Sequence, residues 1–95
     1  MFVILLRFSD NKSDAPKFME AHNAWIDQGL SDGVFLVVGS LKPNAGGAIL
    51  AHGCCEDEIR RRVDQDPFVA ENVVRAEILE IEPNRTDKRF GFLID

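Results

Sequence analysis

Two segments of this chain are apolar on both faces of the strands that they are expected to form, and this feature restricts the fold most. Residues 2–8 read Phe-Val-Ile-Leu-Leu-Arg-Phe, and residues 34–38 read Val-Phe-Leu-Val-Val. Alternate side chains of a strand point to opposite faces, so both faces of each strand need a cover. The first segment lacks the basic start and cleavage site of a signal peptide. No window of the chain approaches the roughly eighteen apolar residues of a membrane helix. We therefore expect two buried strands, without a signal peptide or a membrane span.

The segment between these strands has the spacing of an amphipathic helix that runs to Gln28. Ser13 or Asp14 can cap its start, and Gly29 is expected to end it. At about 100° per residue, one face of this helix gathers its apolar side chains: Ala15, Phe18, Met19, Trp25 and Ile26. His22 lies at the centre of this apolar face.

The remaining segments complete a known order of elements. Residues 42–47 have the turn chemistry of a hairpin, so a strand at 48–52 should pair antiparallel with the strand before it. Further along, we expect a helix at 55–65, a short turn at 68–72 and a strand at 74–81. The order β-α-β-β-α-β predicts an α+β, ferredoxin-like fold, with two helices on one face of a four-stranded antiparallel sheet.

The sheet face that turns away from the helices should be polar in a monomer. Here the strands offer apolar residues on both faces, and 45% of the chain is hydrophobic. We therefore expect a homodimer in which two sheets pack face to face. Pro83 closes the domain at residues 1–83, and residues 84–95 form a tail that packs on the domain, adds a strand or frays.

The charge balance restricts the partners. The 16 Asp and Glu residues outnumber the 11 Lys and Arg residues. The resulting net charge of −5 has the wrong sign for a surface that binds the phosphate backbone of a nucleic acid. We expect no nucleic acid partner. The run Arg60-Arg61-Arg62 follows three acidic residues at a spacing of four, which favours a self-neutralised helix face. Cys54 and Cys55 are neighbours and cannot form an unstrained disulfide together, which favours a reduced, cytoplasmic chain.

The spacing of the histidines, cysteines and glycines does not favour a metal site or a phosphate-binding loop. His52, Cys54 and Cys55 lie within four residues of one another, which is not the paired spacing of a structural zinc site, and we expect no metal. Both cysteines are expected to act as small buried hydrophobes. Gly46 and Gly47 lack the spacing and the lysine of a phosphate-binding loop and are expected to turn the backbone.

Three polar residues are candidates for a functional site, and each has a structural alternative. His22 either is a core histidine with satisfied nitrogens or lines a pocket, where it suits proton transfer. Asp66 either caps the turn that begins at Pro67 or orients the imidazole of His22. Ser40 either binds a ligand or caps the hairpin. Both helices pack on the same sheet face, so a contact between His22 and Asp66 is compatible with the fold.

The chain resembles the YciI-like, or YCII-related, family, whose fold is a dimeric α+β barrel. The likeness is carried by Ala21-His22, Val38-Gly39-Ser40, Gly46-Gly47-Ala48-Ile49, Asp66-Pro67-Phe68-Val69 and Ile81-Glu82-Pro83. The family usually has Ser-Gly-Pro where this chain has Val38-Gly39-Ser40. By this resemblance, His22 and Asp66 fall on the histidine and the aspartate that are regarded as the family's active-site pair.

The resemblance implies a small, cofactor-free enzyme of the lyase or isomerase type that acts on a small cyclic or aromatic ligand. His22 would move a proton, Asp66 would orient the imidazole, and Phe18, Trp25 and Phe68 would form walls of the pocket. The alternative is a non-enzymatic ligand-binding or interaction domain in which His22 and Asp66 are structural.

Overall fold

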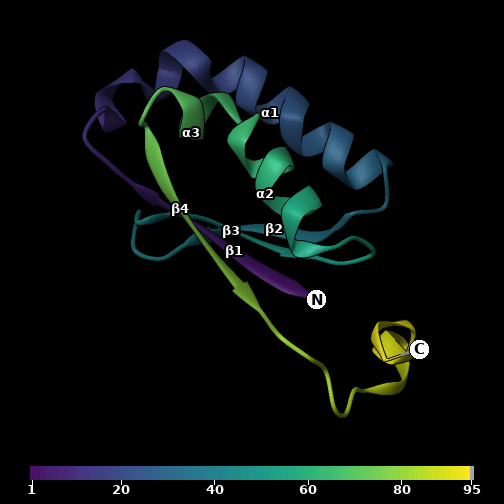
Figure 1. The fold of residues 1–95 in the computed structure, drawn as a ribbon. Coiled ribbons are helices and arrows are strands. Elements are labelled where there is room, and N and C mark those ends of the chain that lie inside the picture. The colour runs from purple at the N-terminus through teal and green to yellow at the C-terminus, as the bar shows by residue number, and fades with distance from the viewer. Residues whose placement is uncertain (95) are drawn as a thin grey trace.

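The computed structural model describes residues 1–94, which form a sheet and a layer of helices (Figure 1). The strands are β1 (Phe2–Phe8), β2 (Phe35–Leu41), β3 (Gly46–Ala51) and β4 (Val74–Glu80). The helices are α1 (Ala15–Ser31), α2 (Glu56–Asp64) and α3 (Pro67–Ala70), with the 3-10 segments η1 (Lys12–Asp14) and η2 (Lys88–Leu93). The predicted order β-α-β-β-α-β is confirmed, and α3 occupies the predicted short turn.

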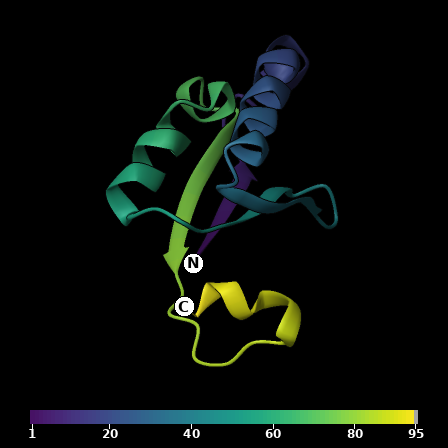
Figure 2. The ribbon, with the colours of Figure 1, turned by 90° about the vertical axis from the view of Figure 1, so that its right-hand side faces the viewer.

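The four strands pair antiparallel in the order β2-β3-β1-β4. The helices α1 and α2 cover the same face of this sheet, as Figures 1 and 2 show. This is the α+β, ferredoxin-like architecture that the sequence predicts.

The hydrophobic core lies between the sheet and the helices. On the sheet side, Ile4 of β1 pairs with Ile49 of β3, and both are buried. On the helix side, Ile59 and Val63 of α2 are also buried, one turn apart on the same face. Burial of one such side chain contributes about 1.5–3 kcal/mol, so these contacts hold α2 against the sheet.

The opposite, outer face of the sheet carries an apolar row that crosses all four strands. Val3 of β1 pairs with Leu50 of β3 and with Leu79 of β4, and Leu50 pairs with Val37 of β2. Val37 is 51% exposed and Leu79 is 44% exposed. The strands are therefore apolar on both faces, as the sequence indicates, and α1 and α2 cover only one of these faces.

The prediction that Gly29 ends the first helix is wrong. The helix α1 continues to Ser31, and Gly29 is buried inside it. A Cβ atom at Gly29 would lie 2.1 Å from Cδ2 of Phe35, so the glycine allows the helix to approach β2 closely. The turn that follows is made instead by Gly33, which has a positive φ of 74°.

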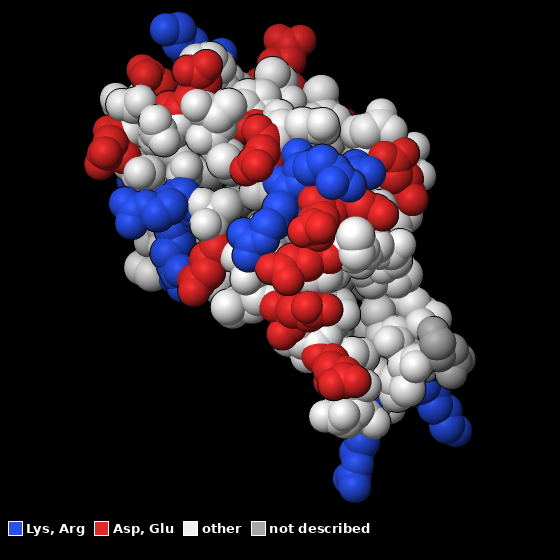
Figure 3. Space-filling view, in the orientation of Figure 1, with Lys and Arg blue, Asp and Glu red and all other residues white. Residues whose placement is uncertain are grey.

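The arginines of α2 pair differently from the predicted pattern. Arg60 pairs with Glu56 at 2.8 Å, as the spacing predicts, but Arg62 pairs with Asp32 at the end of α1, at 3.0 Å. Acidic and basic side chains alternate over the face seen in Figure 3. The Arg62 contact ties α2 to α1, so this part of the basic run joins two elements.

The tail forms a short helical segment beside the outer face of the sheet. In Figure 1, η2 lies below the sheet and away from α1 and α2. The ring of Phe92 meets His52 edge-on at 5.3 Å, while Phe90 and Ile94 stay 40% and 49% exposed. Within residues 1–94, no helix is long and apolar enough to cross a membrane.

Candidate functional site

The structure brings His22 and Asp66 into contact, although 44 positions separate them in the sequence. His22 lies in the middle of α1, and Asp66 lies at the start of α3. The Nδ1 atom of His22 is 2.7 Å from Oδ1 of Asp66. A carboxylate can only accept, so Nδ1 carries the proton of this bond and Nε2 of the neutral ring is left as an acceptor.

Asp66 also caps α3, so both alternatives for this residue occur together. Its Oδ1 accepts a second hydrogen bond, from the backbone N–H of Phe68 at 3.0 Å. The side chain is fully buried, and Oδ2 finds no hydrogen-bond partner among the residues that the structure describes. A buried carboxylate is costly unless a positive or polar group faces it. The buried carboxylate therefore favours the tautomer of His22 in which Nδ1 carries the proton.

Two aromatic rings fix the orientation of the imidazole. The ring of Phe68 stacks on His22 with centroids 3.9 Å apart and an interplanar angle of 3°. Trp25 lies 6.0 Å from His22 and meets Phe35 edge-on at 5.1 Å. Packed rings of this kind restrict the rotamers of a side chain, so the imidazole is held in one orientation.

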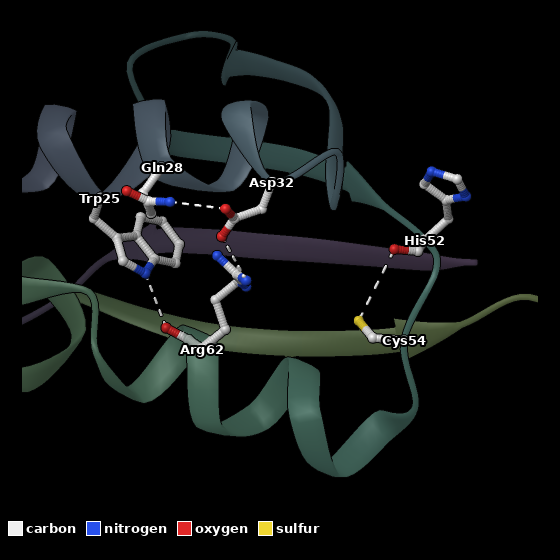
Figure 4. A network of polar contacts seen from close by, with 6 residues as sticks. All are labelled: Trp25, Gln28, Asp32, His52, Cys54 and Arg62. Atoms are coloured by element: carbon white, nitrogen blue, oxygen red, sulfur yellow. Dashed lines mark hydrogen bonds and ion pairs between the residues drawn. The ribbon is translucent and has the colours of Figure 1, made fainter.

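The helix that carries His22 is anchored to α2 by a polar network (Figure 4). The indole N–H of Trp25 donates to the carbonyl of Arg62 at 2.9 Å, and the guanidinium of Arg62 donates to Asp32 at 3.0 Å. The amide of Gln28 donates to the other oxygen of Asp32 at 2.7 Å. The hydrogen bond from Gln28, and then that from Arg62, hold the pKa of Asp32 below its usual value. Asp32 is therefore ionised at neutral pH and keeps the two helices together.

A cavity of about 300 Å³ opens beside His22, between α1 and the sheet. Its lining is mostly apolar: Leu6, Phe8, Met19, His22, Asn23, Ile26, Val38, Gly39, Ser40, Gly46, Gly47, Ala48, Ile49, Phe68 and Val74. The volume is at the small end of the range for ligand sites, which suits a single ring with its substituents. Among these lining residues, His22 is the only one with a titratable side chain.

The predicted site residues divide into two groups. Ser40 and Phe68 line the cavity with His22, whereas Phe18 and Trp25 do not. Phe18 is half-buried against the core, and Trp25 is buried beside His22. Ser40 is a residue of β2 opposite Gly47, and its side chain makes no hydrogen bond within residues 1–94, so it does not cap the hairpin.

Sequence reasoning missed Asn23 as a residue of the cavity wall. Met19, Asn23 and Ile26 have the spacing i, i+4, i+7 and line the cavity together. Phe18 and Trp25 belong to the neighbouring stripe of α1, and His22 lies between the two stripes. Asn23 is polar and lies outside the arc of the apolar side chains, so the hydrophobic pattern does not include it, although its spacing from Met19 and Ile26 contains the signal.

The cysteines lie away from this site. Cys54 is half-buried, with Sγ 3.9 Å from the carbonyl oxygen of His52, and burial raises the pKa of its thiol. Cys55 is exposed at the start of α2, so the expectation that both cysteines are buried is wrong for this residue. Across residues 1–94, no group of three or more His, Cys, Asp or Glu side chains could hold a metal ion.

Comparisons with known proteins agree with the fold. None of the curated proteins matches this chain. Among solved structures, 5-chloro-2-hydroxyhydroquinone dehydrochlorinase from Burkholderia phenoliruptrix, in complex with 2,5-dihydroxybenzoquinone, is similar, with a TM-score of 0.68 and 15% sequence identity. The match covers 85% of this chain and 93% of that chain. Residues 1–82 match the YCII-related domain. This chain therefore belongs to the YCII-related family.

Proposed function

We propose that this chain is a small, cofactor-free enzyme that moves a proton on a cyclic or aromatic, oxygenated substrate, as a lyase or an isomerase. One observation carries the proposal: His22 is paired with a fully buried carboxylate on the wall of a mostly apolar cavity. Imidazole is the side chain best suited to general acid and base work near neutral pH. The pairing with Asp66 leaves its Nε2 atom free for a substrate.

The proposed reaction begins when Nε2 of His22 takes a proton from the substrate. The electron pair of the broken bond then forms a new double bond. In an elimination, a leaving group departs with its own electron pair, and in an isomerisation His22 returns the proton to another atom. Asp66 stabilises the imidazolium that forms in between, so its role is to position and balance the charge of His22.

The similar solved structure gives independent support for the substrate class. That protein is named a dehydrochlorinase of a chlorinated hydroxyhydroquinone, and its complex contains a dihydroxybenzoquinone. In our proposal, Phe68 and Ser40 contact the substrate ring. Trp25 and Phe18 lie outside the cavity lining and support the helix that carries His22.

The rival proposal is a ligand-binding or interaction domain in which the pair is structural. The capping bond from Phe68 to Asp66 favours it, because this bond stabilises α3 whether or not a reaction takes place. The two proposals differ in the expected behaviour of His22, since the cap does not require it.

The test measures proton transfer directly. The purified protein is incubated with 5-chloro-2-hydroxyhydroquinone and with unchlorinated hydroquinones in D₂O, and deuterium incorporation and chloride release are followed. We expect His22→Gln to lower the rate by about 100-fold or more, the usual contribution of general acid–base catalysis. Asp66→Asn keeps an oxygen for the Phe68 cap and should lower the rate less than His22→Gln while the protein stays folded.

His52→Gln is the matched control, because His52 is the other histidine of the chain and packs against Phe92 instead of the cavity. This variant should keep the wild-type rate. A His22→Gln protein that is folded and as active as the wild type would contradict the enzymatic proposal and favour the rival.

We also propose that two copies pair through their outer sheet faces. The apolar row of Val37, Leu50, Val3 and Leu79 supports this, because exposed apolar patches of this kind mark interaction sites. The segment η2 lies beside the Val37 and Leu50 end of the row, and Leu79 lies at the other end. The face lies opposite α1 and α2, whereas the cavity beside His22 lies between α1 and the sheet, so pairing leaves the cavity accessible.

Sedimentation equilibrium tests the pairing. The wild type should show about twice the monomer mass of 10.6 kDa, whereas Leu79→Lys should shift the mass toward the monomer, because it places a charge within the apolar row. Leu79 is 44% exposed, so the variant should keep its fold. A wild type that sediments at 10.6 kDa at micromolar concentration would rule out the pairing.

A further inference from the structure

We infer that the cavity selects uncharged rings that carry at least two hydroxyl or keto groups, and that it rejects rings with a carboxylate or phosphate substituent. This inference rests on the proposed function and adds a specificity role for Asn23, on α1, and for Ser40, on β2.

The charge around the reacting atoms disfavours an anionic substrate. No Lys, Arg, Asp or Glu side chain lines the cavity, and the carboxylate of Asp66 lies buried directly behind His22. With an uncharged substrate, the pair and the substrate together carry one negative charge before and after proton transfer. With a carboxylated substrate they carry two, and no cationic side chain of the lining compensates the second. An unpaired ion that loses water in an apolar site is strongly disfavoured.

Two polar side chains at the cavity have no hydrogen-bond partner among the described residues and can bind a substrate. Asn23 and Ser40 are exposed residues that line the cavity from α1 and from β2, and neither side chain makes a hydrogen bond within residues 1–94. An amide and a hydroxyl can each donate and accept, which matches hydroxyl and keto groups. Together with Nε2 of His22, they give three polar contacts in an otherwise mostly apolar space, a pattern that fixes the orientation of a ring.

The experiment compares three probes that differ by one group. Hydroquinone is uncharged, 2,5-dihydroxybenzoate adds a carboxylate, and the methyl ester of that acid adds the same bulk without the charge. Binding is measured by calorimetry and by the fluorescence of Trp25, the one tryptophan of the chain, which lies 6.0 Å from His22. We expect the ester to bind within about 3-fold of hydroquinone and the free acid at least about 30-fold more weakly than the ester.

Substitutions at the two polar positions sharpen the test. Asn23→Lys places a cation at the rim and should tighten the binding of the free acid by about 5-fold or more, while the control Asn84→Lys should not change it. Asn23→Ala and Ser40→Ala should each weaken the binding of hydroquinone by about 3- to 10-fold, and the control Ser13→Ala should not.

The outcomes separate this inference from the proposed function. If the free acid binds as tightly as its ester while His22→Gln still abolishes proton transfer, the charge selection is wrong and the proposed function stands. If neither hydroquinone nor the ester binds, the selection and the proposed substrate class are both overturned. If Asn23→Ala and Ser40→Ala bind hydroquinone as the wild type does, their specificity role is overturned.

Discussion

Gly29→Ala has two opposite effects on the free energy of unfolding, and their magnitudes decide whether the variant is more or less stable. Inside an α-helix, alanine is more favourable than glycine by about 0.5–1 kcal/mol, so propensity alone predicts a more stable protein. The structure predicts the reverse. The new Cβ would lie 2.1 Å from Cδ2 and 2.2 Å from Cε2 of Phe35. These distances are far below van der Waals contact, so the ring or the helix has to move.

Phe35 has little room to move. It is 3% exposed, and its ring packs edge-on against Trp25 at 5.1 Å. Overpacking of a tight core costs about 1–3 kcal/mol, and the upper half of this range applies here because a second buried ring blocks the first. A cost of roughly 2–3 kcal/mol less a gain of roughly 1 kcal/mol leaves Gly29→Ala about 1–2 kcal/mol less stable than the wild type.

Urea denaturation followed by the fluorescence of Trp25 measures this difference. Gly39→Ala is the control, because a Cβ at Gly39 meets nothing within 4 Å, and it should leave stability unchanged or slightly higher. Phe35→Leu should reduce the cost of Gly29→Ala, so the double variant should be more stable than the sum of the single changes predicts. A Gly29→Ala protein as stable as the wild type, or strict additivity with Phe35→Leu, would refute the close-packing explanation.

Three further outcomes follow from the polar contacts. Burial raises the pKa of the Cys54 thiol, so near pH 8 iodoacetamide should modify exposed Cys55 several-fold faster than Cys54. Peptide mass spectrometry measures the two rates, and equal rates would contradict the difference in burial. The folded-state pKa of Asp32 is below its unfolded value of 3.8, so its stabilisation is present above that value and is lost as the pH falls through the folded pKa. Asp32→Asn should therefore make stability fall less steeply below about pH 4, as acid titrations followed by circular dichroism would show. An unchanged decline would contradict the contact between Asp32 and Arg62. Trp25→Phe should lower the free energy of unfolding by about 0.5–1 kcal/mol, as measured by urea denaturation followed by circular dichroism. This is at the low end for a lost hydrogen bond, because the Arg62 carbonyl also accepts from the backbone of Gln65, and an unchanged stability would mean that the indole bond is not formed in solution.

The element order was predictable from local patterns, and the end of the first helix was not. Strand periodicity and turn residues are properties of short windows, so the strands and the hairpin follow from the sequence. Gly29 has the pattern of a helix stop because glycine is favoured just after a helix. Its actual role depends on the distance to Phe35 across the core, which no window of the sequence contains.

The candidate site was predictable in part for the same reason. The apolar face of α1 indicates that His22 points inward, but that face is broad enough to include two stripes with different surroundings. Trp25 lies on the stripe toward the core, whereas Met19 lies on the stripe toward the cavity. The hydrophobic pattern predicts that both side chains point toward the sheet, and only the packing of α1 on the sheet distinguishes the core stripe from the cavity stripe. For Asp66, capping could be predicted from the Asp-Pro pair, but contact with a residue 44 positions away could not.

Asp66, Pro67 and Phe68 act as one structural unit, and this explains why the three residues are contiguous. Pro67 begins α3 with a fixed φ, which suits the first helical position. The N–H of Phe68 then fixes the carboxylate of Asp66 by donating to Oδ1, the same oxygen that faces Nδ1 of His22. The ring of Phe68 covers the imidazole from one side at 3.9 Å. The cap thus sets the orientation of the carboxylate and the stack sets that of the imidazole. Local folding of α3 therefore orients the pair, and a variant that removes the cap changes the fold of α3 and the geometry of the pair together.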